Sequence, residues 1–239
     1  MRLDRYLVEE EYFESRNRAL EAIKAGKVKV DGKIAKPSIK VDNHSLVEVD
    51  NEKFYVSRAA RKLEQFLISH PVALKGKKAL DIGSSTGGFA QILLENGVET
   101  VCCVDVGKDQ LHASLQNDPR LSLYEQTDIR NFESAIKFDL ITCDVSFISI
   151  LQILDDIERL AASDAEIIIL YKPQFEVGKE AKRNSKGVVV DQDAIERKKE
   201  AFEQYVLGLG WKCISQAHSE VHGKEGNREY LYHFIKSEK

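Results

Sequence analysis

Hydrophobic residues from about residue 78 onward alternate between short apolar runs, typical of buried strands, and helix-spaced stripes. Strands are expected at residues 79–82, 100–106, 122–124, 140–144 and 166–171. Helices are expected at residues 88–96, 108–116, 150–161 and 191–209. Two late strands, 212–219 and 228–235, follow each other directly and should pair antiparallel. The alternation predicts an α/β fold with a Rossmann-like, doubly wound sheet and a terminal antiparallel strand.

The first 50 residues have a different pattern, that of a small α/β module. Ser15 is a suitable N-cap for a helix that runs to Ala25 and ends at Gly26. Asp31-Gly32 between short apolar segments predicts a hairpin, and residues 46–49 predict a further strand. Together these elements predict a separate N-terminal domain.

The domain organisation follows from these two patterns. We expect a small domain at residues 1–50, a linker at 51–56 and a larger domain at 57–239. Ser57 is expected to cap a helix that reaches about residue 69. The polar side of that helix carries Arg58, Arg61 and Lys62, just before the first strand of the sheet.

Charge is distributed unevenly along the chain. The net charge is −4, which does not point to nucleic acid, yet residues 16–40 hold eight basic residues against only Glu21 and Asp31. A solvated lysine-rich surface would have the same composition, but the concentration on one helix and its hairpin suits phosphate contacts. The candidate RNA-binding residues are Arg16, Arg18, Lys24, Lys27, Lys29, Lys36 and Arg58.

A glycine-rich segment follows the first strand of the larger domain, from Asp81 to Phe89. It departs from the dinucleotide pattern GxGxxG and lacks the lysine of a phosphate-binding loop. It fits a loop around the methionine part of S-adenosylmethionine, with Asp105 on the ribose and Asp128 on the adenine amino group. A tight turn and, for Asp128, a helix cap are the alternatives. The candidate cofactor-binding residues are Asp81, Gly83, Ser84, Ser85, Thr86, Gly87, Gly88, Phe89, Asp105, Val106, Asp128 and Ile129.

Three charged residues are expected at one edge of the sheet, two of them just after a strand and one at the start of a strand. Asp144 follows the fourth strand, Lys172 the fifth, and Glu229 starts the last one. Lys62 on the preceding helix could complete a cluster of two lysines and two carboxylates. A ribose hydroxyl is a poor nucleophile, and a buried lysine can accept its proton or stabilise the alkoxide. Surface ion pairs are the alternative interpretation of each residue.

The sequence shows no signal for a metal site, for secretion or for a membrane span. The four cysteines lie in apolar segments without metal-ligand spacing, as expected for reduced thiols in a cytoplasmic protein. The charged N-terminus lacks the apolar core of a signal peptide, and no apolar run approaches the ~18 residues of a membrane span. We expect neither a metal nor a membrane as partner. Oligomeric state is not readable, and a monomer is the default.

The motifs, taken in order, resemble two known families. The N-terminal set resembles the RNA-binding domain named after protein S4 of the small ribosomal subunit. Its segments are Leu3-Asp4, Ser15-Arg16, 26–32 and 36–38. The rest resembles the TlyA family, through segments 57–63, 81–89, 143–147, 171–176, 186–187 and 226–231. Where that family usually has Ser-Arg-Gly-Gly, this chain has Ser57-Arg-Ala-Ala60, and alanines favour a helix start.

The resemblance implies an FtsJ-like methyltransferase that modifies the ribose 2′-hydroxyl of cytidine in ribosomal RNA, with S-adenosylmethionine as donor. It implies ribosomal RNA and ribosomal subunits as partners. The catalytic residues would be Lys62, Asp144, Lys172 and Glu229. The short chain resembles the shorter family form, which is expected to act on large-subunit RNA.

Three other functions are alternatives to methyl transfer, and each predicts different sequence features. A pore-forming haemolysin, a label the family has carried, predicts an insertion segment, and none is visible. An RNA-binding assembly factor with an inactive methyltransferase domain would not need the glycine loop together with all four charged residues. An enzyme that uses a nicotinamide cofactor would be expected to carry GxGxxG.

Overall fold

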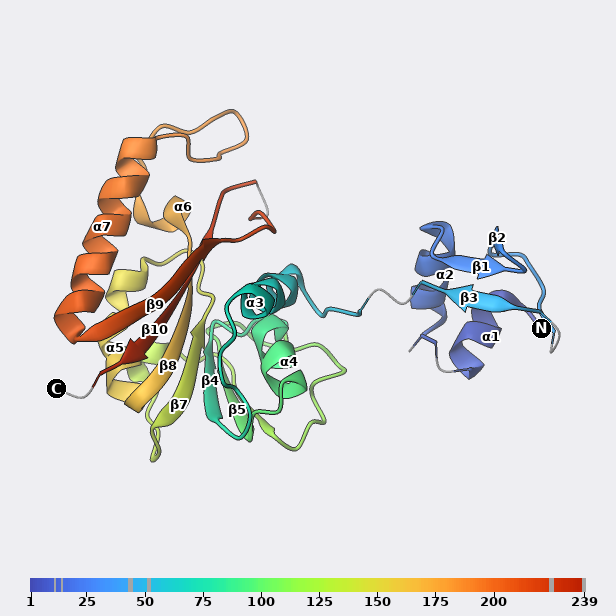
Figure 1. The fold of residues 1–239 in the computed structure, drawn as a ribbon, viewed down its shortest axis with the longest axis horizontal. Helices are drawn as coiled ribbons and strands as arrows, with labels where there is room; N and C mark the ends of the chain where they lie inside the picture. Colours follow the sequence, from blue (N-terminus) through green and yellow to red (C-terminus); the bar gives the residue numbers. More distant parts are fainter. Residues whose placement is uncertain (11, 14, 43–44, 51–52, 224–225, 238–239) are drawn as a thin grey trace. The chain divides into compact units, whose positions relative to one another are not determined.

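A computed structural model describes residues 1–10, 12–13, 15–42, 45–50, 53–223 and 226–237 of the protein. The chain forms two compact units, Met1–Phe54 and Tyr55–Lys239. Residues 51 and 52 of the expected linker lie outside the described residues. Figure 1 shows the elements of both units.

The N-terminal unit packs two helices on a small antiparallel sheet of order β2-β1-β3. Its elements are α1 (Leu3–Glu9), α2 (Arg16–Lys24), β1 (Val28–Val30), β2 (Lys33–Ile34) and β3 (Val47–Val49). The Ser15 side chain accepts a hydrogen bond from Arg18 N, so the expected cap is confirmed. Asp31 and Gly32 both have positive φ, as a type I′ hairpin turn requires, so the expected hairpin is confirmed as well.

The C-terminal unit is built on a seven-stranded sheet of order β6-β5-β4-β7-β8-β10-β9. Its strands are β4 (Lys78–Ile82), β5 (Thr100–Val104), β6 (Leu121–Tyr124), β7 (Phe138–Cys143), β8 (Ala161–Tyr171), β9 (Trp211–His218) and β10 (Tyr230–Lys236). Strands β4 to β8 pair in parallel, and β10 runs antiparallel between β8 and β9. This confirms the expected doubly wound α/β sheet, in which the antiparallel strand β10 lies next to the edge strand β9.

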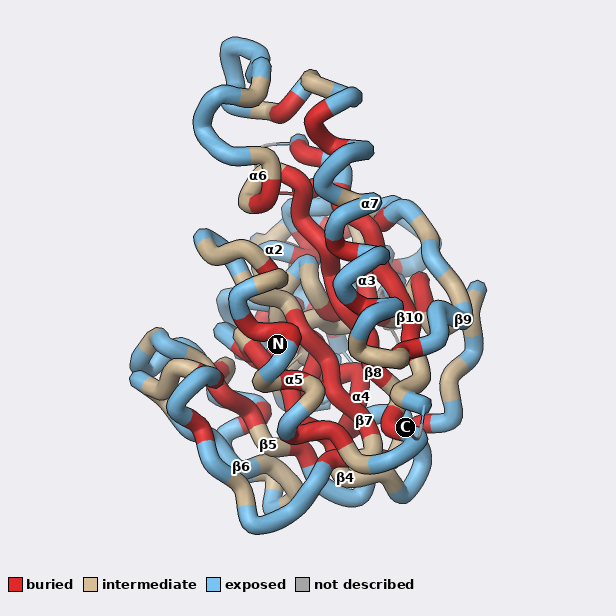
Figure 2. Tube along the Cα trace, turned by 90° about the vertical axis from the view of Figure 1, so that its left-hand side faces the viewer, coloured by how far each residue is buried: buried red, intermediate tan, exposed pale blue. Residues whose placement is uncertain are grey.

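Helices cover both faces of this sheet (Figure 1). They are α3 (Arg58–Ser69), α4 (Gly88–Glu95), α5 (Leu154–Leu160), α6 (Pro173–Glu176) and α7 (Gln192–Leu209), with 3-10 turns η1 (Ile129–Asn131) and η2 (Ile150–Gln152). Along β8, Ile168 and Leu170 pack with α3 and α4, whereas Ile167 and Ile169 pack with α5 and α7. This two-residue alternation gives one apolar core on each face of a sheet whose central strands are buried (Figure 2).

Two expected helices differ from the structure. Residues 108–116 form successive turns instead of a helix. Leu111 and Leu115 are buried, as helical spacing predicts, but the amide of His112 donates to Thr86 O in the glycine loop. The His112 ring also accepts from Ser114 N, so local polar bonds replace helical ones. The expected helix 150–161 splits into η2 and α5, and β8 already begins at Ala161.

Candidate active site

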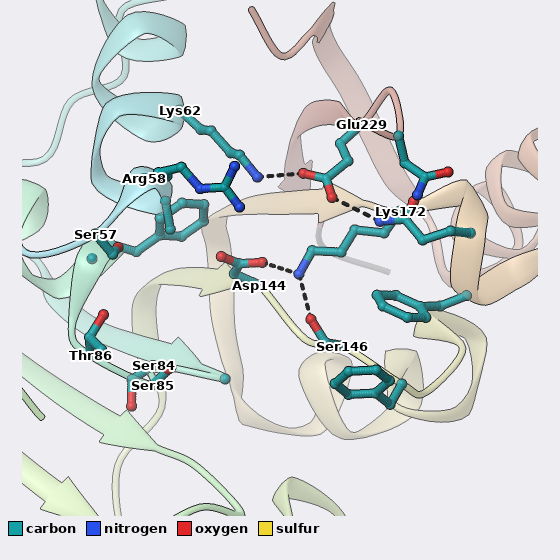
Figure 3. Close-up of a pocket in the computed structure, with 18 of the residues that line it drawn as sticks. Ser57, Arg58, Lys62, Ser84, Ser85, Thr86, Asp144, Ser146, Lys172 and Glu229 are labelled. Carbon is teal, nitrogen blue, oxygen red and sulfur yellow. Dashed lines mark hydrogen bonds and ion pairs between the residues drawn. The ribbon is translucent and has the colours of Figure 1, made fainter. Parts of the chain in front are cut away.

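A cavity of about 660 Å³ opens at the carboxyl ends of β4, β7 and β8. Parallel strands with helices on both faces place their ligand sites at this edge. The lining comes from the start of α3, the glycine loop after β4, the ends of β7 and β8, and the residues before β10. Figure 3 shows how these side chains converge.

Two ion pairs lie side by side in this cavity (Figure 3). Lys62 Nζ on α3 lies 2.5 Å from Glu229 Oε2, and Lys172 Nζ lies 2.5 Å from Asp144 Oδ1. Lys62, Lys172 and Glu229 are each less than one-tenth exposed. The structure therefore brings together all four residues that were expected to form the cluster.

The topology explains why four residues from distant segments meet. Strands β7 and β8 are parallel neighbours, so Asp144 and Lys172 leave the sheet at the same edge. Strand β10 pairs Tyr230 with Tyr171, which places Glu229 beside the end of β8. Lys62 lies on the buried face of α3, next to Leu63 and one turn from Phe66.

Burial dominates the electrostatics of the cluster. Burial raises the pKa of Asp144, while the charges of Lys172 and Lys62 oppose that rise. Two lysines and two carboxylates balance each other, which a buried cluster requires because an unpaired charge is costly there. The arrangement holds a lysine amine and a carboxyl in fixed contact inside a cavity that is open to a ligand.

The glycine loop between β4 and α4 brings its backbone close to the cluster. Gly83 has φ +76°, and a Cβ on it would lie 2.9 Å from the main-chain oxygen of Asp144. Gly87 is also in the left-handed region, with φ +86°. Glycine at these two positions therefore lets the loop form a cradle of main-chain atoms. Ser84, Ser85, Thr86, Gly88 and Phe89 line the same cavity.

Asp81 lies beneath this loop and is fully buried. Its carboxylate accepts hydrogen bonds from the Ala90 amide at 3.1 Å and from the Thr142 hydroxyl at 2.7 Å. Burial raises the pKa of Asp81 to about 7, although the bond from Thr142 opposes the rise. The geometry thus shows Asp81 fixing the start of α4 relative to β4 and β7.

A second cavity, of about 400 Å³, adjoins the first and shares Gly83 and Ser85 with it. Asp105, Val106, Asp128 and Ile129, all expected at a cofactor site, line it. Asp105 accepts hydrogen bonds from the amides of Ser85 and Gly107, which closes the glycine loop.

Asp128 has a structural task in this second cavity. It caps η1 by accepting from the Arg130 amide, and its carboxylate pairs with the Arg130 guanidinium at 2.6 Å. Hydrogen bonds from Arg130 keep the pKa of Asp128 below its ordinary value. The helix cap weighed as an alternative is therefore present, and the carboxylate still lines the cavity.

Ser57 is a site residue that the sequence pattern assigned a different task. It occupies the N-cap position of α3, but its side chain makes no capping hydrogen bond, so that prediction was wrong. The hydroxyl turns toward α4 instead, where a Cβ on Gly88 would lie 2.1 Å from Ser57 Oγ. Its oxygen is buried and has no hydrogen-bond partner among the described residues. The sequence offered one signal for this contact, which is the glycine at position 88 that leaves room for the Ser57 hydroxyl.

Phe147 is a second residue that the pattern did not single out. It is 91% exposed, has φ +66°, and lines both cavities. Its ring lies 5.1 Å from that of Phe175. A large apolar side chain held in a left-handed backbone conformation and exposed beside a polar cavity is available to stack on a ligand.

The candidate RNA-binding residues fall in both units. In the N-terminal unit, Arg18, Lys24, Lys29 and Lys36 are exposed, whereas Lys27 is half-buried. Arg16 pairs with the buried Asp4 at 2.7 Å. Bonds from Arg16 and Arg2 lower the pKa of Asp4 to about 2. Arg16 thus has a structural role in its domain. Arg58 lies in the other unit, in the lining of the first cavity.

Two further features bear on ligands and environment. Within the described residues, no group of three or more His, Cys, Asp or Glu side chains could hold a metal ion. In the same part of the chain, no helix combines the length and apolar character needed to cross a membrane.

Comparison with known proteins identifies the two units. The profile described as FtsJ-like methyltransferase matches residues 55–236, and that of the S4 domain matches residues 1–47. A Campylobacter jejuni protein named 23S rRNA (cytidine-2′-O)-methyltransferase TlyA is 46% identical, over 93% of this chain and 95% of its own. A Mycobacterium tuberculosis protein named 16S/23S rRNA (cytidine-2′-O)-methyltransferase TlyA is 40% identical, over 96% of this chain and 88% of its own.

A solved structure from Streptococcus thermophilus, described as a candidate hemolysin, has the same architecture. It is 32% identical with a TM-score of 0.74, and the match covers 100% of this chain and 89% of that one. The profile matches and the identities across nearly the whole chain agree with the observed fold. The chain therefore belongs to the FtsJ-like methyltransferases and, among them, to the TlyA family, and its first 47 residues form an S4 domain.

Proposed function

We propose that the protein transfers a methyl group from S-adenosylmethionine to the ribose 2′-hydroxyl of a cytidine in ribosomal RNA of the large subunit. The observation that carries the proposal is the buried Lys172–Asp144 pair beside the glycine loop, with Lys62–Glu229 next to it. The relative that is 46% identical is named for this reaction on 23S rRNA, and the one that is 40% identical is named for it on 16S and 23S rRNA.

The residues present fit S-adenosylmethionine. The second cavity would take the adenosine, with Asp105 accepting from the ribose hydroxyls and Asp128 near the base. The glycine backbone would lie along the methionine part. The buried Ser57 hydroxyl and the first-turn amides of α4 suit its carboxylate. When bound, the group supplies an electrophilic methyl on a sulfonium.

The protein's own residues would then position and deprotonate the acceptor. The ribose oxygen bonds to the methyl carbon as the carbon–sulfur bond breaks, which releases S-adenosylhomocysteine. In this step the nitrogen of a neutral Lys172 amine would take the hydroxyl proton on its lone pair. Asp144 holds that nitrogen in place. Lys62 and Glu229, next to this pair, would help to hold the ribose. Positioning of this kind can contribute several kcal/mol to the rate.

Recognition of the RNA would be divided between the units. Arg18, Lys24, Lys29 and Lys36 are exposed in the S4 domain and suit phosphate contacts. A paired nucleotide must leave its helix to reach a buried lysine. The exposed Phe147 ring would stack on the displaced base. We expect the enzyme to work in the cytoplasm on ribosomal subunits.

Transfer of labelled methyl groups tests the proposal. Purified protein is incubated with tritiated S-adenosylmethionine and separated ribosomal subunits, and the modified nucleotide is mapped. We expect label at one cytidine 2′-oxygen of the large-subunit RNA and a rate lower by about 100-fold or more with Lys172→Ala. Label on a base nitrogen or carbon, or none with either subunit, would contradict the proposal. Leakage from liposomes at the same protein concentration would instead support a hemolysin activity like that named for the Streptococcus protein.

A further inference from the structure

Two neutral side chains contact the charged cluster. Ser146 Oγ accepts a hydrogen bond from Lys172 Nζ at 2.8 Å (Figure 3), and Gln174 Nε2 donates one to Glu229 Oε1 at 2.9 Å. Ser146 stands two residues after Asp144, and Gln174 stands two residues after Lys172. The ends of β7 and β8 therefore each supply a charged and then a neutral side chain to one cavity.

Ser146 restricts the direction of the Lys172 side-chain nitrogen. A lysine stem is flexible, and in the form that can accept a proton its tetrahedral nitrogen carries two N–H donors and one lone pair. The contact with Asp144 Oδ1 at 2.5 Å holds the nitrogen in place, and the hydrogen bond to Ser146 Oγ at 2.8 Å fixes one N–H direction. Together these two contacts restrict where the lone pair can point. Without the serine, the nitrogen could turn about its contact with Asp144.

Gln174 completes the bonding of Glu229. This carboxylate is 3% exposed, and its two oxygens are divided between Lys62 and Gln174. Because a carboxylate accepts hydrogen bonds and donates none, the amide must turn its NH₂ group toward it. That leaves Gln174 Oε1 buried without a partner among the described residues. A buried acceptor without a partner costs stability. The orientation of the amide therefore favours the hydrogen bond to Glu229 at the expense of one for Gln174 Oε1.

We propose that Ser146 and Gln174 are positioning residues for methyl transfer. Ser146 acts through Lys172 and fixes where that nitrogen points, and Gln174 acts through Glu229 and fixes the position of its carboxylate. The inference rests on the proposed function, since it assigns both residues to the same reaction. It extends the cluster of two lysines and two carboxylates to a network of six side chains.

Single substitutions test the two assignments by separating kcat from KM. Ser146→Ala and Gln174→Leu should each lower kcat by about 10- to 100-fold, the effect of a misplacement of about 1 Å. We expect the RNA KM and the dissociation constant of S-adenosylhomocysteine to stay within about twofold. Ser146→Thr, which keeps the hydroxyl, should recover most of the rate. The matched control is Gln152→Leu, which removes an exposed amide on η2 and should leave kcat unchanged.

Double substitutions show whether each residue acts through its partner. Ser146→Ala should cause no further loss in a Lys172→Ala background, and Gln174→Leu none in a Glu229→Ala background.

Three results would overturn the inference. The first is a wild-type kcat in both single variants. The second is a loss of kcat that is accompanied by losses of S-adenosylhomocysteine affinity and of melting temperature, which would indicate a merely structural role. The third is an additional loss of rate in the Lys172→Ala background. If the wild type itself transfers no methyl group to RNA, the proposed function fails along with the inference. Transfer by the wild type and unchanged variants would overturn the inference alone.

Discussion

The two units of the protein use positive charge in opposite ways. In the methyltransferase domain, Lys62 and Lys172 are buried and each contacts a carboxylate at 2.5 Å. In the S4 domain, Lys24, Lys29 and Lys36 are exposed. A buried pair has one fixed geometry and little sensitivity to salt, whereas exposed lysines attract phosphates over a distance and are screened by salt. Chemistry should therefore depend on single atoms, and RNA affinity on the number of charges.

The largest expected effect is on the buried side of this comparison. Lys172→Ala should lower methyl transfer by about 10²- to 10⁴-fold, because it removes the group that accepts the proton. Binding of S-adenosylhomocysteine, measured by calorimetry, should stay within about twofold. Lys186→Ala, which removes an exposed lysine, is the matched control. Near-normal turnover by Lys172→Ala would remove this residue from the mechanism.

The second effect concerns the exposed side. Reversing Arg18, Lys24 and Lys29 to Glu should weaken RNA binding by about tenfold or more and reduce its salt slope by about two to three. Arg16 is left in place because it holds the buried Asp4. The measurement is a filter-binding titration at several salt concentrations. An unchanged slope would mean that these residues do not meet phosphates.

A smaller effect is expected at the cavity assigned to adenosine. Asp105→Ala should weaken S-adenosylhomocysteine binding by about 1–3 kcal/mol, since ribose hydroxyls and the Ser85 amide lose their acceptor. Asp109→Ala, on an exposed turn nearby, is the control. If the dissociation constant for Asp105→Ala equals that of the wild type, the adenosine does not lie where we place it.

The smallest effect is a pH dependence of stability. Burial raises the pKa of Asp81 to about 7, so the folded protein keeps a proton that the unfolded chain loses near pH 4. This residue therefore costs stability as the pH rises from about 4 to 7. Relative to Asp81→Asn, the wild type should lose about 1 kcal/mol or more of unfolding free energy between pH 5 and 7. Urea titrations across that range measure it, and a constant difference would contradict the shift.

Much of the fold could be predicted because its elements carry strong local signals. The apolar runs of β4, β7 and β8 and the hairpin at Asp31-Gly32 were all recognisable. The segment 108–116 could not be, since its helical spacing of Leu111 and Leu115 also suits a chain of turns. The hydrogen bond from the His112 amide to Thr86 O in the glycine loop favours the turns over a helix, and it depends on a distant part of the chain.

The site residues also fall into those that the sequence predicts and those that it does not. Asp144 and Lys172 follow strand ends, where a charge after an apolar run is conspicuous. Ser57, Ser146 and Gln174 are ordinary polar residues by type and spacing. Their importance lies in contacts with Gly88, Lys172 and Glu229 across the fold. Such contacts leave no periodic trace in one sequence.

The most direct test of the central claim is a crystal structure with S-adenosylhomocysteine bound. We predict the sulfur over the glycine loop near Gly83, facing Lys172 Nζ across a gap that the transferred methyl group and one hydroxyl oxygen would fill, with that oxygen about 3 Å from the nitrogen. A sulfur on the far side of the loop, or a Lys172 nitrogen turned away from it with Asp144 in between, would contradict the account.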